Sequence, residues 1–203
     1  MPSDLFRAIE GHDANRVAQL LAQGANPNAT NEDGWTPLQI AIDETIDGGS
    51  PEVVGMLLNH GAKVNPPEGQ TPTLLLAWRP TNKQVARLLL EAGADANVST
   101  DSGESPLRDS VAEGDLDMVS LLLKRGADRS IDDWRVVDGG KTALGIAASQ
   151  FNLPMIKLLI DAGANPDATD DAYKTAREYL PPREKSDPRT WDEAMELLSR
   201  HRS

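Results

Sequence analysis

The sequence predicts an all-α chain in which a helix-turn-helix unit occurs about six times, with β-hairpin-like loops joining the units. The first observation is a recurring Leu-Leu/Ile-x-x-Gly-Ala segment, whose glycines are 32 to 37 residues apart, at positions 24, 61, 93, 126 and 163. The second is a Gly-x-Thr/Ser-Pro-Leu turn between copies, as in Gly34 to Leu38. The third is an apolar stripe on the longer segments, as in Val53 to Leu58. A fixed period of this length is typical of stacked repeats.

Each element of the unit has a residue that favours it. The Thr or Ser hydroxyl caps free N–H groups at the start of the first helix, and Pro in the first turn loses no intrahelical hydrogen bond. The recurring Gly permits the left-handed termination of the second helix. One such helical pair cannot bury its apolar face alone, so the units are expected to stack.

The sequence resembles the ankyrin repeat family over essentially its whole length. The resemblance depends on Gly34-x-Thr36-Pro37-Leu38, Gly103-x-Ser105-Pro106-Leu107, Gly140-x-Thr142-Ala143-Leu144 and the five Gly-Ala pairs. It implies a solenoid formed by a single ankyrin repeat domain over 1–203. Its units are expected at about 1–31 (the N-terminal cap), 32–66, 67–99, 100–132, 133–168 and 169–203 (the C-terminal cap).

Several departures from the family pattern are expected to matter. The histidine that usually follows Thr-Pro-Leu is replaced by Gln39, Arg108 and Gly145, so the hydrogen bonds that it makes are in doubt. Longer loops are expected at 45–50, 131–140 and 181–191, followed by a last helix at about 191–200. Insertions in repeat proteins often map to the binding face.

Composition limits the function classes. The net charge is −12 with a pI near 4.6, and residues 1–65 hold nine acidic against three basic side chains. Such a balance disfavours nucleic acid or an anionic membrane as partner. The chain has no cysteine, and its three histidines are scattered, so neither a metal nor a catalytic constellation is indicated. We expect a cytoplasmic monomer without a cofactor.

The residue between the hairpin Gly and the Thr-Pro turn suggests where a partner binds. In an ankyrin-like stack this residue faces the concave groove, and the five copies differ completely: Trp35, Gln70, Glu104, Lys141 and Lys174. Variation among copies indicates recognition rather than structure. Trp35 is therefore the leading candidate for a binding hot spot, with packing over the neighbouring hairpin as the alternative.

Acidic residues near Trp35 are expected to form a rim suited to a basic partner. Trp78 ends a first helix and either binds or caps, and Trp134 lies in the longest hairpin and either binds or packs onto its neighbour. The predicted partner-binding residues are Trp35, Glu32, Asp33, Asp43, Glu44, Asp47, Gln70, Trp78, Arg79, Glu104, Glu113, Trp134, Arg135 and Lys141.

The predicted function is a non-enzymatic module that binds a protein, with a basic surface, through its groove and hairpins, as an adaptor or inhibitor. One alternative is an immunity or antitoxin protein that neutralises a basic toxin such as a nuclease. A second is a small hydrolase that uses Asp/Glu pairs in the inserted loops, and a third is a structural spacer.

Overall fold

The predicted caps set most helix boundaries in the computed structural model. Thr36, Ser105 and Thr142 are the N-caps of three first helices, and each accepts a hydrogen bond from the backbone N–H three residues later. In the third copy, by contrast, Pro72 takes the N-cap position and no side chain caps the helix. All five recurring glycines have a positive φ, between 86° and 105°, at positions 24, 61, 93, 126 and 163.

The structure describes residues 2–67, 70–79, 82–100, 103, 105–133 and 140–199. These residues contain eleven α-helices and no strand, which confirms the all-α prediction for this part of the chain. The helices are α1 Pro2–Glu10, α2 Ala14–Ala22, α3 Pro37–Glu44, α4 Pro51–Asn59, α5 Thr73–Ala77, α6 Lys83–Glu91, α7 Pro106–Ala112, α8 Leu116–Lys124, α9 Ala143–Ser149, α10 Leu153–Asp161 and α11 Pro188–Leu198. Short 3-10 helices lie at Ala127–Ser130, Ala176–Tyr179 and Arg183–Lys185.

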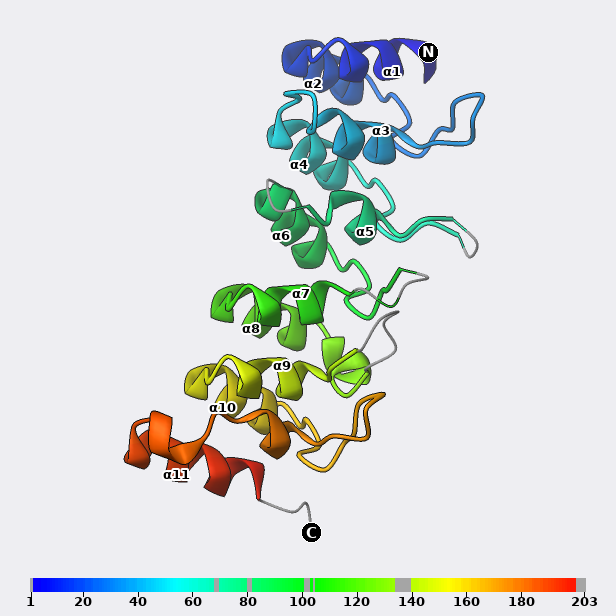
Figure 1. The fold of residues 1–203 in the computed structure, drawn as a ribbon. Helices are drawn as coiled ribbons and strands as arrows, with labels where there is room; N and C mark the ends of the chain where they lie inside the picture. The colour runs from blue at the N-terminus through cyan, green and yellow to red at the C-terminus, as the bar shows by residue number, and fades with distance from the viewer. Residues whose placement is uncertain are drawn as a thin grey trace. The chain divides into compact units, whose positions relative to one another are not determined.

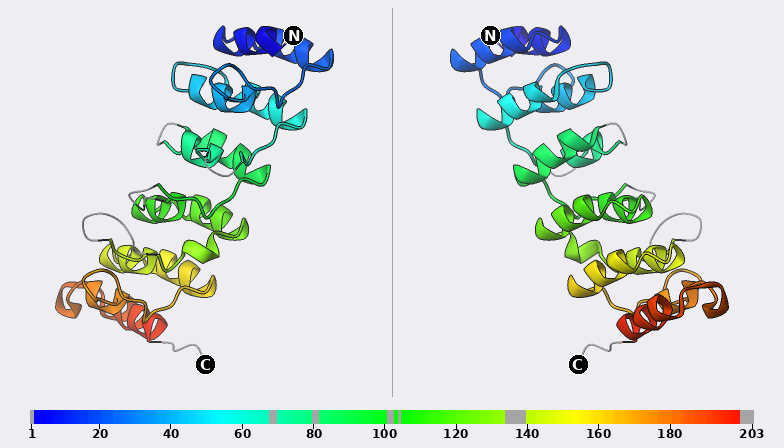
Figure 2. Two further views of the ribbon diagram at one scale, coloured as in Figure 1. Left: turned by 90° about the vertical axis from the view of Figure 1, so that its right-hand side faces the viewer. Right: turned by 90° about the vertical axis from the view of Figure 1, so that its left-hand side faces the viewer.

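The chain divides into two compact units, Met1–Asp95 and Ala96–Ser203, which we call unit 1 and unit 2. In unit 1 the pairs α1–α2, α3–α4 and α5–α6 follow one another, with their connecting loops projecting to one side (Figure 1). Unit 2 holds the pairs α7–α8 and α9–α10, then α11, and further views show the same layering within it (Figure 2). The predicted single domain and repeat boundaries stay predictions.

Apolar side chains from both helices of each pair form the core. In unit 1, Leu38, Leu57 and Leu89 are fully buried, and in unit 2 so are Leu107 and Leu122. Each helix contributes one apolar stripe, and burying a leucine side chain stabilises the fold by roughly 1.5–3 kcal/mol. Stacking therefore supplies the burial that one pair alone could not reach.

Asparagine side chains connect successive pairs. The Asn28 amide donates to the carbonyl of Gly61 at 2.8 Å and accepts from the backbone N–H of Lys63 at 2.8 Å. Asn65 makes the same two contacts one pair later, to Gly93 at 2.9 Å and Asp95 at 3.0 Å. In unit 2, Asn97 donates to Gly126 at 2.5 Å. These bridges fix the spacing of the left-handed glycine turns.

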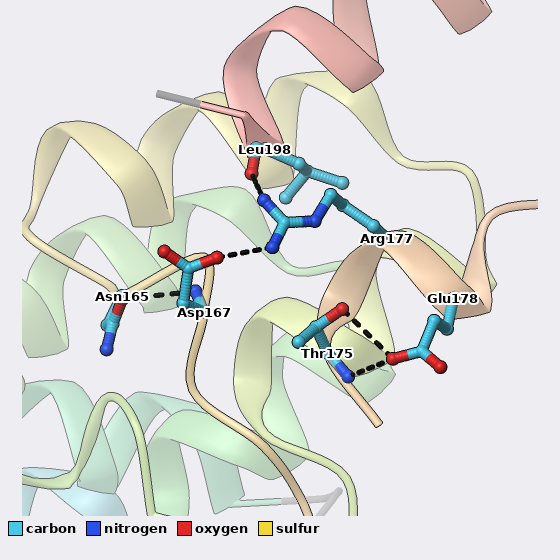
Figure 3. A network of polar contacts seen from close by, with 6 residues as sticks. All are labelled: Asn165, Asp167, Thr175, Arg177, Glu178 and Leu198. Atoms are coloured by element: carbon cyan, nitrogen blue, oxygen red, sulfur yellow. Dashed lines mark hydrogen bonds and ion pairs between the residues drawn. The ribbon is translucent and has the colours of Figure 1, made fainter. Parts of the chain in front are cut away.

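The C-terminal segment ends the stack through polar contacts (Figure 3). The Arg177 guanidinium donates to the carbonyl of Leu198, at the end of α11, at 2.7 Å and pairs with Asp167. The last helix begins at Pro188, so the predicted start at Trp191 was wrong. Asp187 caps the helix and Pro188 occupies its first turn, a combination that favours the earlier start.

The asparagine bridge is testable by its contribution to stability. We expect Asn28→Ala to lower the free energy of unfolding by about 1–2 kcal/mol, because two hydrogen bonds to the next pair are lost. Urea denaturation measures this change. Asn59→Ala removes an exposed amide from the end of α4 and is the matched control, with an expected change below about 0.5 kcal/mol. Equal losses in the two variants would contradict a structural role for the bridge.

Candidate functional site

A hydrogen-bonded hairpin, Asn31 to Trp35, holds the predicted hot spot in place. The Asn31 side-chain oxygen accepts from the backbone N–H groups of Asp33, at 3.1 Å, and Trp35, at 2.8 Å. The backbone N–H of Asn31 donates to the carbonyl of Trp35 at 2.9 Å. Gly34 has φ +81°, in the left-handed region that glycine adopts without strain. The backbone of Trp35 is thus fixed before any partner arrives.

Trp35 is half-buried and lines a pocket of about 260 Å³ in unit 1. We call this the Trp35 pocket, and its lining residues are Asp33, Gly34, Trp35, Gln39, Gln70, Thr71 and Leu76. Its volume falls below the roughly 300–1,000 Å³ of typical small-molecule sites. A hollow of this size with one carboxylate suits a single protruding side chain.

Gln39 replaces the expected family histidine and shapes this pocket. Its side-chain oxygen accepts from the backbone N–H of Thr36 at 2.9 Å and from the Thr36 hydroxyl at 3.1 Å. The Thr36 hydroxyl in turn accepts from the Gln39 N–H, so the two residues form a capping box. The glutamine thereby provides a local hydrogen bond at the start of α3.

Two further pockets flank the same hairpin. One, of about 180 Å³, shares Gly34, Gln39 and Gln70 with the Trp35 pocket and extends to Lys63 and Asn65. The other, of about 410 Å³, is lined by Ser3, Phe6, Thr30, Asn31 and Glu32. The hairpin is therefore bordered by hollows into which partner side chains could fit.

The predicted acidic residues do not all gather at Trp35. Asp33 lines its pocket and Glu32 lines the neighbouring one. Asp43 is exposed in the last turn of the eight-residue helix α3, about 10 Å along the axis from its first residue, and Asp47 is exposed beyond the end of the helix. The Glu44 carboxylate lies 2.7 Å from His12 Nε2, a contact between successive pairs. Asp33 is thus the predicted carboxylate that lines the pocket together with the tryptophan.

The other predicted residues have separate locations. Gln70 lines the Trp35 pocket together with Trp35. Trp78 is the half-buried C-cap of α5, and Arg79 is exposed beside it. Neither Trp78 nor Arg79 lines the Trp35 pocket. Glu113 is an exposed C-cap of α7. The predictions that lie outside the described residues are Glu104, Trp134 and Arg135.

In unit 2 the predicted residue Lys141 meets a second hairpin, Asp170 to Lys174. Its bonds repeat those of the first hairpin: the Asp170 carboxylate accepts from the N–H groups of Ala172 and Lys174, and the Asp170 N–H donates to the Lys174 carbonyl. Lys174 thus occupies the position of Trp35. The Lys141 and Lys174 ammonium groups lie 4.7 Å and 5.5 Å from the centroid of the Tyr179 ring.

The Tyr179 hydroxyl donates a hydrogen bond to the Asp170 carboxylate. Burial acts to raise the pKa of Asp170, but this bond and the two backbone bonds outweigh it, so the pKa lies below its usual value. The bond to Asp170, together with burial and nearby carboxylate charge, raises the pKa of Tyr179 to about 12. Tyr179 is therefore a neutral phenol at physiological pH.

Sequence reasoning missed Tyr173 and Tyr179. Tyr173 is 87% exposed and has φ +56°, at the hairpin position where Gly34 and Gly103 have φ +81°. A side chain in this backbone region is strained. The missed signal was a bulky residue at a position that is glycine in earlier copies.

The described residues include no group of three or more His, Asp or Glu side chains placed to hold a metal ion. In the same part of the chain, no helix combines the length and apolar character needed to cross a membrane.

A family model described as ankyrin repeats in three copies matches residues 5–100 and 74–170. The chain is 29% identical over 172 residues to the human transient receptor potential cation channel subfamily A member 1, covering 82% of this chain and 15% of that protein. It is 33% identical over 162 residues to neurogenic locus notch homolog protein 1 of Danio rerio, covering 73% and 6%. It therefore spans a small part of these curated relatives.

Solved structures resemble the whole chain. EF0377, an ankyrin repeat protein, has a TM-score of 0.66 at 23% identity, and the match covers 100% of this chain and 99% of that one. A chain in the complex of the predatory endopeptidase Bd0816 from Bdellovibrio bacteriovorus with the immunity protein Bd3460 has a TM-score of 0.61 at 25% identity, covering 95% and 97%. These likenesses confirm the predicted repeat fold.

The Tyr179–Asp170 bond is testable by pH titration. The raised pKa means that the protonated phenol stabilises the fold, fully below about pH 10, and that this contribution is lost as the pH rises through about 12. In a Tyr173→Phe background Tyr179 is the only tyrosine, and near-ultraviolet absorbance follows it. We expect Asp170→Asn to lower the midpoint towards 10. Circular dichroism on the same samples identifies alkaline unfolding, and an unchanged midpoint in folded protein would contradict the assignment.

The strain at Tyr173 predicts a stabilising substitution. We expect Tyr173→Gly to raise the free energy of unfolding by about 0.5–1 kcal/mol, since relief of the left-handed strain exceeds the added entropy of the unfolded chain. Tyr173→Ala keeps a Cβ atom and is expected to give no such gain. Thermal or urea unfolding compares the two, and a stability loss in the glycine variant would show that the Tyr173 ring packs usefully within the chain.

Proposed function

We propose that this chain, which belongs to the ankyrin repeat family, is a non-enzymatic module that binds a basic protein through the Trp35 pocket. Ankyrin repeats indicate a protein-protein interaction module. The observation that supports the finer proposal is the pocket itself, where a half-buried indole and the Asp33 carboxylate lie together on a fixed hairpin.

The geometry favours one inserted side chain as the anchor of binding. A lysine or arginine of the partner would place its aliphatic stem against Trp35 and its charge near Asp33, combining a cation–π contact with an ion pair. The amides of Gln39 and Gln70 add polar groups at the wall. An acidic residue would be repelled by the like charge of Asp33, so the pocket favours basic over acidic side chains.

Two properties of unit 1 add to the affinity expected for such a partner. The exposed carboxylates Glu32, Asp43 and Asp47 extend the negative surface beyond the pocket and would speed the encounter with a basic protein. The hairpin is held by its own hydrogen bonds, so binding orders little backbone and costs little conformational entropy.

The biological role is proposed as adaptor or inhibitor, acting as a monomer in the cytoplasm. An immunity or antitoxin protein against a basic toxin, such as a nuclease, is the second candidate. It is supported by the likeness to a chain from a complex of an endopeptidase with an immunity protein. A carboxylate-based hydrolase lacks comparable support, because each of the three pockets described in unit 1 has at most one carboxylate.

The proposal is tested with a short peptide of alternating lysine and leucine. At low salt we expect Trp35→Ala to weaken its binding about 30-fold, as for an interface hot spot of about 2 kcal/mol. Asp33→Lys leaves the indole in place and should weaken binding by a similar factor. Isothermal titration calorimetry gives the dissociation constants, and circular dichroism verifies that each variant is folded.

Asp161→Lys is the matched control, because it makes the same charge change at an exposed site on α10 in unit 2. Its affinity should stay within about twofold of the wild type, because Asp161 does not line the Trp35 pocket. If Asp161→Lys and Asp33→Lys weaken binding equally, attraction by net charge replaces the Trp35 pocket as the explanation.

A further inference from the structure

Two lysines share one aromatic ring in unit 2. The ammonium groups of Lys141 and Lys174 lie 4.7 Å and 5.5 Å from the centre of the Tyr179 ring. Neither forms an ion pair within the part of the chain that the structure describes, although the Lys174 charge interacts with the Asp170 carboxylate at longer range. This arrangement is unexpected where 32 acidic residues face 20 basic ones, because carboxylates to pair with them are abundant. The two positive charges next to one ring also repel each other, and this repulsion lowers the stability of the fold.

The nearby carboxylates are mostly engaged. Asp170 is 3% exposed and accepts hydrogen bonds from the Tyr179 hydroxyl and two backbone N–H groups. Glu178 accepts from the backbone N–H and the hydroxyl of Thr175 at 2.7 Å and 3.1 Å. Asp171, next to Asp170, is exposed. Glu178 stays exposed despite these bonds, so the charges around the ring are the two ammonium groups and the Asp171 and Glu178 carboxylates.

Three features of the structure accompany this arrangement of lysines around Tyr179. Gly145 stands where the family has histidine, and a Cβ atom there would lie 3.4 Å from the Tyr179 ring. The Asp170 hairpin holds Lys174 beside that ring. At the hairpin tip, Tyr173 is 87% exposed on a strained backbone. An exposed aromatic side chain beside a lysine in the sequence is typical of protein contact sites, where tyrosine contributes area at low entropic cost.

We propose that Lys141, Lys174, Tyr173 and Tyr179 form a second contact surface, the tyrosine–lysine surface, which binds an acidic segment of a protein partner. Glutamate or aspartate side chains of that segment pair with the two ammonium groups, and an apolar residue of the segment covers the Tyr173 ring. The inference rests on the proposed function as a protein-binding module. Its ligand has the opposite charge to the one proposed for the Trp35 pocket, because Lys141 and Lys174 occupy the positions that Trp35 and Gln70 hold in earlier copies.

The test uses the full ¹⁵N-labelled chain and a short peptide of alternating glutamate and leucine at low salt. We expect the peptide to change the amide chemical shifts of residues 170–175. We expect Lys174→Glu to weaken peptide binding about tenfold. Lys174→Gln removes the charge without reversing it. Its affinity for the peptide should therefore lie between those of the wild type and Lys174→Glu. Asp171→Asn should strengthen binding, because it removes one of the accessible negative charges.

Lys157→Glu is the matched control, since Lys157 is an exposed lysine on α10 in the same unit. Equal weakening by Lys157→Glu and Lys174→Glu, or the absence of shifts over 170–175, would overturn the proposal. Titration with the lysine–leucine peptide separates the two proposals. If that peptide binds and depends on Trp35 while the acidic peptide does not bind, only the tyrosine–lysine surface is wrong.

Discussion

The asparagine bridge between successive helical pairs is the contact on which the rest of the structure depends. Asn28 and Asn65 each join a carbonyl and an N–H group of the next pair, and Asn97 donates to the carbonyl of Gly126. Because the bridged groups lie at left-handed glycine turns, the bridges repeat one backbone geometry from pair to pair. Apolar burial supplies most of the stabilisation, whereas these hydrogen bonds set the register.

A fixed register lets one position vary freely. The Asn31 and Asp170 hairpins share the same side-chain and backbone bonds, although one presents Trp35 and the other Lys174. The scaffold therefore presents an indole beside a carboxylate in unit 1 and two ammonium groups on a phenol in unit 2. This separation of scaffold from recognition is the physical basis of protein binding by repeats, because rigid presentation keeps the entropic cost low.

Local signals in the sequence predicted the helices well. Thr36 and Ser105 mark helix starts, and each recurring glycine marks an end, because capping and left-handed turns depend on neighbouring residues. Contacts between residues far apart in the chain were less predictable. The His12–Glu44 contact joins residues 32 positions apart, and no local pattern encodes it. Likewise, Trp35 and Gln70 were predicted singly from the repeat alignment, but the pocket that they share with Gln39 and Leu76 depends on packing.

The central claim is that the hairpins are formed before a partner binds and that the residue after the turn glycine makes the contact. Amide hydrogen exchange, with and without the lysine–leucine peptide, tests it most directly. The account predicts that protection rises at residues 31–35 and 70–71 while the rates in α3 and α4 stay unchanged. Slower exchange throughout α3 and α4, with no added protection in the hairpin, would mean that binding orders the helices and would contradict it.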